Sequence, residues 1–434
     1  MRTVTVLTAA ALGAFLFTAC PRRPVPPPAK PSPVPTPAPT PAPTPVPVPT
    51  PPPTPYVPNK RMEVGKMFNG AQVRASLETV AGGSASGVRK ETGSYEVEVK
   101  VRVTIPKPHQ SLEELTKLHS QLPALLPGLP ALLETAKVSP FWDDLYRAKT
   151  TLLQKNLTRF DNLLTRHDLF DCETVLELQH PATKRRALLI QADMDTDGDG
   201  SDSDREPEID GSSATFQPMT SYRWAKKTEV PNSFILPRET KQRQYEIELA
   251  TPGVSPARSS DLREGIARMK SEISDLKKYS FLVAATDPFI VLPLSMIGKK
   301  SAFACGIGDY CVVAHGGVLY PAIVGDAGPA AKAGEGSLRL CKQLNAKASA
   351  TYRPESDLKV TYLIFPGTNE TPWDAPDLVK IRARCEKLLG EIGGFGGELF
   401  HWPDLIRPPP PLIPAPTPTP TPPPAPAPVT APAK

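Results

Sequence analysis

The sequence of 434 residues lacks long hydrophobic runs and has few of the residues that build zinc sites. Its apolar stretch near the N-terminus, from Val4 to Phe17, is too short to cross a bilayer as a stable helix. The six cysteines have no zinc-knuckle spacing and no histidine cluster beside them. The net charge of +5 is small and does not by itself select a partner. These absences argue against a helical membrane protein and a zinc-knuckle domain.

Proline, by contrast, is abundant, with 56 residues concentrated at the two ends of the chain. Residues 20–58 and 408–434 alternate proline mostly with valine, alanine and threonine. Such segments cannot donate a regular hydrogen-bond ladder and bury almost nothing, so we predict disordered, extended polyproline II tails. At ~3.1 Å per residue, the first tail is long enough to hold a domain up to about 120 Å from an anchor. The folded part is therefore expected within residues 59–407.

The N-terminus is typical of a secretory signal peptide over residues 1–19. The sequence Phe17-Thr18-Ala19-Cys20 is similar to a bacterial lipobox, whose cysteine becomes the lipidated first residue of the mature protein. Pro21 follows, instead of the aspartate that favours retention at the inner membrane. We predict an outer-membrane or cell-surface lipoprotein of the cell envelope, attached to the membrane only through a lipid on Cys20. A secreted protein with a chance cysteine is the alternative.

Hydrophobic periodicity predicts both strands and helices in the folded part. From Ser94 to Pro106, strictly alternating apolar residues indicate a half-buried strand. Apolar residues at helical spacing predict three amphipathic helices, and Ser139 and Pro140 form the cap and first turn of the first one. Their predicted bounds are Phe141–Arg166, Ser260–Lys278 and Asp377–Ile392.

Five short apolar runs of β-type composition lie between these helices. They predict an α+β fold, in which a compact mixed β-sheet or small β-barrel core is decorated by helices. No second linker divides residues 59–407, so the runs are expected to belong to one main domain. The runs are Ala187–Asp193, Phe289–Ser295, Cys311–His315, Leu319–Gly325 and Leu358–Pro366.

With Cys20 assigned to the lipid, an odd number of cysteines remains for the folded part. In an oxidising envelope one pair could close, and Cys305 and Cys311 are near enough in sequence to do so across a turn. Cys172 and Cys385 are expected to be free and buried.

Two glycine-framed carboxylates lie nine residues apart, Asp326 after Gly325 and Glu335 between two further glycines. An apolar run leads into Asp326, so this acid stands near the end of a buried strand. Neighbouring glycines let the backbone turn tightly and let a ligand come close. Such a pair suits acid/base chemistry on a bound substrate. The alternative is that Asp326 caps a turn and Glu335 is a solvated loop acid.

An aspartate-rich segment follows the first apolar run of the main domain. So many like charges repel each other unless a cation or water screens them. Three interpretations are open: a calcium loop, a site for a cationic substrate, or a solvated acidic loop. The first half follows the ligand spacing of a calcium loop, but its twelfth position is aspartate instead of the bidentate glutamate. The six carboxylates, within twelve residues, are Asp193, Asp195, Asp197, Asp199, Asp202 and Asp204.

Together these motifs resemble the glycoside hydrolase family 75 chitosanases, which cut polymers of glucosamine. The resemblance covers residues 170–370 and rests on the order and spacing of several segments. These are Phe170-DCETVLEL-Gln179, Ala192-DMDTDGDGSD-Ser203, Asp287-PFIVLP-Leu294, Val312-VAHGGVLYPAIVGDAG-Pro329, Gly334-EGS-Leu338 and Val360-TYLIF-Pro366.

The resemblance implies that residues 170–407 are a chitosanase-like catalytic domain. It does not cover residues 59–169, which are expected to be an N-terminal region of unknown role packed on the catalytic part. The essential carboxylates of the family lie in its GD and GE motifs, which fall here on Asp326 and Glu335. The family inverts the anomeric centre, which requires a general acid and a general base about 6.5 to 9.5 Å apart. We assign Glu335 as acid and Asp326 as base, although the roles could be exchanged. The mechanism requires no cofactor or metal.

The aspartate-rich segment then has a function in such an enzyme. Asp193, Asp195 and Asp197 are predicted to bind the ammonium groups of the polysaccharide, with calcium at Asp193–Asp204 as the alternative. Tyr320, and also Tyr222 and Trp224, are candidates for stacking on sugar faces, or are core residues. So many aspartates beside the cleft argue against a nucleic-acid partner.

Three functions remain open at this stage. The first is an envelope-tethered hydrolase of β-1,4-linked glucosamine polymers. The second is a peptidoglycan-directed glycan-cleaving enzyme, since wall glycan is at hand for an envelope protein. The third is a non-catalytic surface lipoprotein that binds calcium or glycan.

Overall fold

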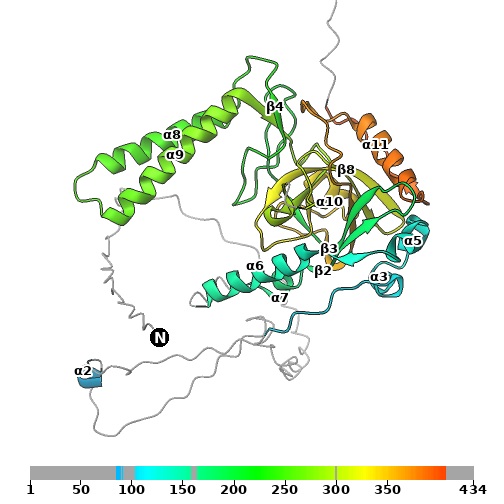
Figure 1. The fold of residues 1–434 in the computed structure, drawn as a ribbon. Coiled ribbons are helices and arrows are strands. Elements are labelled where there is room, and N and C mark those ends of the chain that lie inside the picture. Colours follow the sequence, from blue (N-terminus) through cyan, green and yellow to red (C-terminus); the bar gives the residue numbers. More distant parts are fainter. Residues whose placement is uncertain (1–84, 89, 91–102, 158–163, 299–300, 407–434) are drawn as a thin grey trace, which may run out of the picture. The chain divides into compact units, whose positions relative to one another are not determined.

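Six strands close into a mixed β-barrel in the computed structural model of the chain (Figure 1). They are β3 (Arg186–Asp197), β6 (Phe289–Pro293), β7 (Tyr310–His315), β8 (Val318–Gly328), β9 (Glu335–Ser337) and β10 (Glu355–Ile364). Around the barrel the order is β3, β10, β7, β8, β6 and β9, and β9 pairs with β3 again. The β6–β8 and β3–β9 pairs are parallel, and the other neighbours are antiparallel. The predicted α+β class with a small barrel core is confirmed.

The structure describes residues 85–88, 90, 103–157, 164–298 and 301–406. The predicted signal peptide, Cys20 and both proline-rich tails lie outside these residues. Most of the strand expected at 94–106 also lies outside them, and its last residues, 103–106, are irregular. Within the described ranges, no helix is both long enough and apolar enough to cross a membrane.

The alternating pattern of β3 places its side chains in two different buried clusters. Leu188, Ile190 and Ala192 enter one cluster, and Ala187 and Leu189 enter the other. Each of the five predicted apolar runs forms a barrel strand. Each run carries apolar side chains on both faces of the strand, so both faces can be buried. The three-residue strand β9 was not predicted, since it is glycine-rich and too short to show a period.

Within the described residues, five further strands lie outside the barrel. β2 pairs with β3 along most of its length, and β1 pairs with β2. β11 adds to β8, and β4 and β5 form a separate pair. Their bounds are β1 (Lys137–Val138), β2 (Cys172–Gln179), β4 (Arg223–Ala225), β5 (Tyr279–Phe281) and β11 (Glu398–Leu399).

Four helices of the N-terminal region, α3 to α6, pack on the barrel sheet. The leucines of α3, α4 and α5 enter the cluster that contains Leu189, and the aromatic residues of α6 enter the one that contains Ile190. The bounds are α3 (Leu112–Leu118), α4 (Leu122–Leu125), α5 (Leu129–Leu133), α6 (Pro140–Asn156) and α7 (Arg166–Leu169), after a short α2 (Ala85–Val88).

The first predicted helix was placed correctly at its start but was too long. Ser139 caps α6 by accepting a hydrogen bond from Phe141 N, with Pro140 in the first turn. α6 ends at Asn156 instead of Arg166, and α7 begins separately after Thr165. Thr165 and Asp168 form a capping box, a start signal that the apolar periodicity alone did not reveal.

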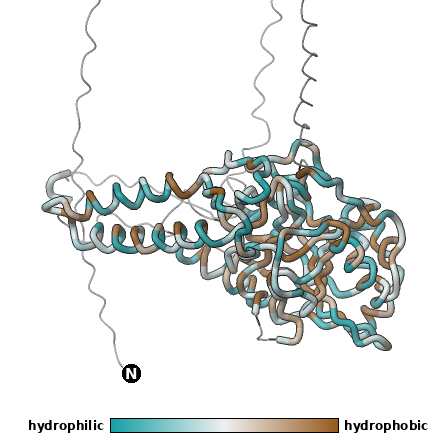
Figure 2. Tube along the Cα trace, turned by 90° about the horizontal axis from the view of Figure 1, so that it is seen from above, coloured by the Kyte–Doolittle hydropathy of each residue, from teal (hydrophilic) through white to brown (hydrophobic). Residues whose placement is uncertain are grey.

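The other two predicted helices are α9 (Pro256–Lys278) and α11 (Leu378–Glu391). Ser255 and Asp377 cap them, and Gly393 follows α11 at a φ of +108°. α9 pairs with α8 (Ile235–Ala250), which buries none of its side chains. Figure 2 shows these two helices side by side and largely hydrophilic. The remaining helices are α10 (Leu338–Leu344) and the 3₁₀ turn η2 (Leu294–Met296).

All five cysteines of the described residues are free and buried. The suggested disulfide between Cys305 and Cys311 is therefore absent. Both side chains pack in the apolar cluster that contains Ile190, and burial raises the pKa of both thiols. A thiol that resists deprotonation is a poor nucleophile for disulfide exchange. Cys172 and Cys385 are free and buried, as predicted.

Candidate active site

Asp326 and Glu335 lie in one row across the barrel wall. Val291 of β6 is the register partner of Asp326 on β8 and, on its other side, of Glu335 on β9. Asp195 of β3 is in turn the partner of Glu335. Neighbouring strands are ~4.8 Å apart, so the Cα atoms of Asp326 and Glu335 are separated by about 10 Å. The barrel therefore brings three acids together across four adjacent strands.

Asp326 is half-buried and is held by donors from a distant segment. Its Oδ1 accepts hydrogen bonds from Ser221 N at 2.9 Å, from Ala327 N at 2.7 Å and from the Ser221 hydroxyl. Tyr222 N donates to Gly325 O at 2.9 Å, which fixes this segment alongside β8. Burial raises the pKa of Asp326, and the hydrogen bonds from Ser221 and Ala327 oppose that rise.

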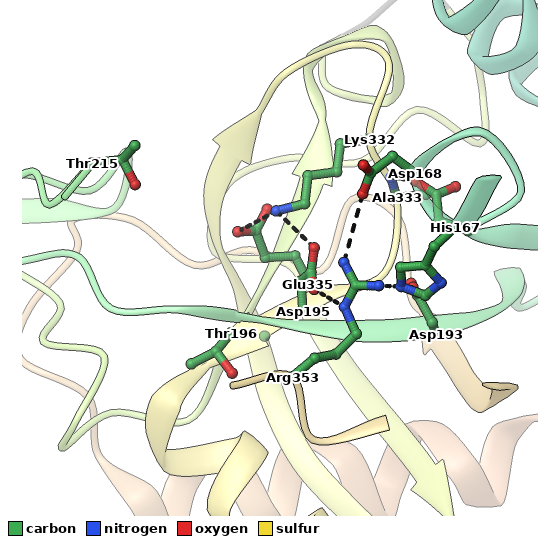
Figure 3. Close-up of polar contacts among 12 residues, drawn as sticks. His167, Asp168, Asp193, Asp195, Thr196, Thr215, Lys332, Ala333, Glu335 and Arg353 are labelled. Atoms are coloured by element: carbon green, nitrogen blue, oxygen red, sulfur yellow. Dashed lines mark hydrogen bonds and ion pairs between the residues drawn. The ribbon is translucent and has the colours of Figure 1, made fainter. Parts of the chain in front are cut away.

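Glu335 is 17% exposed and forms an ion pair with the lysine three residues before it. Lys332 Nζ lies 3.2 Å from Glu335 Oε1 and 3.1 Å from Asp195 Oδ2, so one ammonium bridges two carboxylates (Figure 3). Burial raises the pKa of Glu335; Lys332 opposes this rise, and the charges of Asp195 and Asp326 add to it. The same two carboxylates, Glu335 and Asp195, hold the pKa of Lys332 above its ordinary value, although burial alone would lower it.

The first two aspartates of the acidic segment are already paired with cations of the chain. Asp193 is 1% exposed; its Oδ2 lies 2.6 Å from His167 Nε2 and 3.5 Å from the guanidinium of Arg353. Arg353 also pairs with Asp195, as Figure 3 shows. Burial raises the pKa of Asp193 to about 10, with further contributions from Asp171 and Asp195. Asp193 therefore offers little charge to a substrate.

Asp197 and Asp199 are the part of the acidic segment whose negative charge is less balanced by cations of the chain. Asp197 is 7% exposed and accepts one hydrogen bond, from Asp199 N at 2.8 Å. Burial raises the pKa of both carboxyls, that of Asp199 to about 6, and the charges of Glu335 and Asp326 raise them further. Among the described residues, neither forms an ion pair with a lysine, arginine or histidine. These two acids and the pair Asp326 and Glu335 thus share one negative region, in which burial and mutual repulsion hold part of the carboxyls protonated.

Comparison with known proteins agrees with this geometry. Residues 194–399 match the family model described as fungal chitosanase of glycosyl hydrolase group 75. Residues 194–399 are a glycosyl hydrolase family 75 domain. A domain of this family implies glycoside hydrolase activity and suggests chitosan as the substrate. No curated protein matches the chain.

The matched range of the family 75 domain includes Asp326 and Glu335 but starts after Asp193. It begins and ends later in the chain than the resemblance over residues 170–370. Residues 103–157 and 164–193, although described and packed against the barrel, lie before it.

The aromatic candidates occupy three different environments in the family 75 domain. Tyr320 is 7% exposed and packs against Phe400 and Trp402. It precedes Asp326 by six residues on β8, a distance of about 20 Å, so stacking on a sugar at Asp326 does not fit this position. Trp224 is buried under the guanidinium of Arg205. Tyr222 is next to Ser221 and stacks on Trp373 with ring centroids 4.9 Å apart, which places it near Asp326.

The calcium interpretation does not match the donor set. Asp193 and Asp195, which would be the first and third ligands, are paired with His167, Arg353 and Lys332. Asp204, the proposed twelfth ligand, accepts hydrogen bonds from Thr228 and the Lys227 backbone. Within the described ranges, no group of three or more His, Cys, Asp or Glu side chains is arranged to hold a metal ion.

Sequence reasoning missed the residues that surround the two acids of the family 75 domain. Ser221 lies 105 residues before Asp326 and carries no local signal. Lys332 lies three residues before Glu335. A single lysine so close to a candidate acid could have indicated an ion pair between them. Arg353 and His167 approach the aspartates only because the barrel closes, so no sequence pattern reveals them.

Proposed function

We propose that this domain hydrolyses β-1,4-linked glucosamine polymers by an inverting acid/base mechanism at Asp326 and Glu335. The observation that carries the proposal is the row in which one strand, β6, separates the two acids. Inverting enzymes keep their carboxyls about 6.5 to 9.5 Å apart to admit a water molecule, whereas retaining enzymes need about 5 Å. Acids on adjacent strands would be too close for that water; acids two strands apart leave room.

The surroundings support Glu335 as general acid and Asp326 as general base. Three donors converge on Asp326 Oδ1 and stabilise its ionised form, which leaves Oδ2 to take a proton from water. Burial, together with the like charges of Asp195 and Asp326, raises the pKa of Glu335 and favours its protonated form, although Lys332 opposes this rise. A protonated Glu335 gives its proton to the leaving glycosidic oxygen.

The negative region favours a cationic glycan over peptidoglycan. Asp197 and Asp199 are the aspartates left to bind substrate ammonium groups, because Asp193 and Asp195 are paired within the chain. Peptidoglycan sugars are N-acetylated and uncharged at that nitrogen. They therefore provide no cation to offset the free-energy cost of desolvating these acids.

The test is hydrolysis of defined chitosan and of peptidoglycan, followed by NMR of the first products. We expect shorter glucosamine oligomers whose new reducing ends are initially α-anomers, since inversion of a β-linkage gives the α-anomer. An initial β-anomer would contradict inversion, products only from peptidoglycan would favour the second function, and chitosan binding without turnover would favour the non-catalytic one.

We further propose that the protein is tethered to the cell envelope by lipid on Cys20, on the basis of the lipobox-like residues before it. We expect the N-terminal peptide from isolated membranes to begin at Cys20 and to carry the mass of lipid. Mass spectrometry decides this, and an unmodified Cys20 or cleavage at another position would remove the anchor. A Cys20→Ser chain is the control, expected in the soluble fraction.

A further inference from the structure

A fully buried lysine connects α6 to the turn that precedes Glu335. Lys149 is 0% exposed, and its ammonium has a partner for each of its three donors. Nζ lies 2.8 Å from Asp168 O, 2.7 Å from Asp171 Oδ2 and 2.6 Å from Ala331 O. A buried ammonium is costly unless it is fully paired, so this arrangement has one well-defined geometry.

The partner of Lys149 contacts the same turn. Asp171, 3% exposed, accepts a second hydrogen bond at Oδ2 from Ala333 N at 3.1 Å. Its backbone carbonyl accepts from Asp193 N at 3.0 Å, which ties it to β3. The buried pair therefore holds Ala331 and Ala333, the two residues that flank Lys332.

Lys332 is the cation nearest Glu335 in this site. Its side chain leaves the held turn and bridges Glu335 and Asp195 (Figure 3). The other charged groups that act on Glu335 are acids, namely Asp195, Asp197 and Asp199 of the acidic segment and Asp326 of β8. The position of Lys332 therefore decides how strongly that negative field is compensated.

We propose that Lys149 and Asp171 are positioning residues, whose buried pair holds the turn 331–333 so that the Lys332 ammonium stays against Glu335. Both residues lie before the matched range of the family 75 domain, so this role gives the N-terminal region a part in the reaction. The inference rests on the proposed function of Glu335. Lys332 lowers the pKa of Glu335, so a displaced Lys332 would let that pKa rise.

The test replaces the pair by apolar residues of similar size in the variant Lys149→Met/Asp171→Leu. The double change avoids the uncompensated charge that either single change would leave in the core. We expect the pKa of Glu335 to rise by about 1, the scale of an opposite charge within a few ångströms. A general acid with a higher pKa stays protonated to higher pH, so the alkaline limb of kcat/KM should move upward by the same amount.

A second background separates positioning from a general loss of structure. In a Lys332→Met chain, the double change at Lys149 and Asp171 should produce no further shift, because the group that it positions is gone. The matched control is Arg185→Met/Glu391→Leu, which removes a pair 2.5 Å apart between the residue just before β3 and the last residue of α11. We expect this control to leave the alkaline limb of kcat/KM at the same pH as in the unchanged protein.

The pKa of Glu335 is also read by ¹³C NMR of labelled glutamate carboxyls, with the signal assigned by its loss in Glu335→Gln. This readout needs no turnover, so it tests the positioning even if the protein does not cut chitosan. An unchanged pKa in Lys149→Met/Asp171→Leu would overturn the inference, and so would an equal shift in the Lys332→Met background. Absent hydrolysis with a shifted pKa would reject the proposed function and keep the positioning role.

Discussion

Replacing Asp326 or Glu335 by its amide is expected to lower kcat for chitosan hydrolysis by about 10² to 10⁴-fold, the range of a single general acid or base. Asn keeps the size of Asp326 and the hydrogen bond from Ser221 N, but its side chain cannot accept a proton from water. Gln at position 335 cannot give a proton to the leaving oxygen. The fold should survive, since both acids are only half-buried. Melting temperature and circular dichroism check this.

A substrate with a good leaving group separates the two roles. An aryl glycoside of glucosamine needs little protonation, so it should restore much of the rate of Glu335→Gln and little of the rate of Asp326→Asn. The opposite pattern would exchange acid and base. Asp357→Asn is the control, because Asp357 is exposed and paired with Lys359. Turnover near that of the unchanged protein in either amide variant would exclude the substituted residue from the chemistry and contradict the assignment of this pair.

Gly334→Ala is expected to destabilise the protein by about 2–4 kcal/mol and to reduce activity at least tenfold. Gly334 has a φ of +73°, which costs another residue about 1–2 kcal/mol. A Cβ there would also lie 2.5 Å from both the carbonyl oxygen and Oδ1 of Asp193, so the backbone must move. Because Gly334 O accepts from Asp195 N at 2.8 Å, that movement also displaces Glu335.

Gly367→Ala is the matched control for this variant. Gly367 has nearly the same φ, +74°, but a Cβ there meets nothing within 4 Å. It should cost only the backbone strain, about 1–2 kcal/mol, and leave activity unchanged. Urea unfolding gives both free energies, and chitosan hydrolysis gives both rates. Equal losses of stability and activity in the two variants would show that the contact with Asp193 does not matter.

Local sequence patterns revealed five of the six barrel strands and three of the helices around them, but not the strand order. The run at residues 358–366 has β-branched residues and became β10, yet nothing local shows that it lies between β3 and β7. Strand order depends on which faces pack together after the chain closes, and, apart from β7 and β8, neighbouring strands of the barrel are far apart in the sequence. The ends of α6 show the same limit, because periodicity placed the start well but ran past Asn156.

The site was predictable to the extent that its residues are neighbours in sequence. Asp326 and Glu335 share one short glycine-rich stretch, and the barrel places them in one row. The predicted roles of Asp193 and Tyr320 do not fit their surroundings, since His167 and Arg353 pair with the first and the core surrounds the second. Charge compensation and burial depend on distant residues, so a list of acids cannot tell a paired carboxylate from a free one.

The range matched by the family model begins at residue 194, inside β3. A fragment trimmed to that range would keep residues 194–197 of a strand that starts at Arg186. β10 would lose Ile190 and Leu189 as partners and would expose an open edge, which invites aggregation. The smallest portion that can be expressed alone or transplanted onto another carrier must therefore begin before Arg186, where β3 starts, so the range that the family model matches is shorter than the range that folding requires.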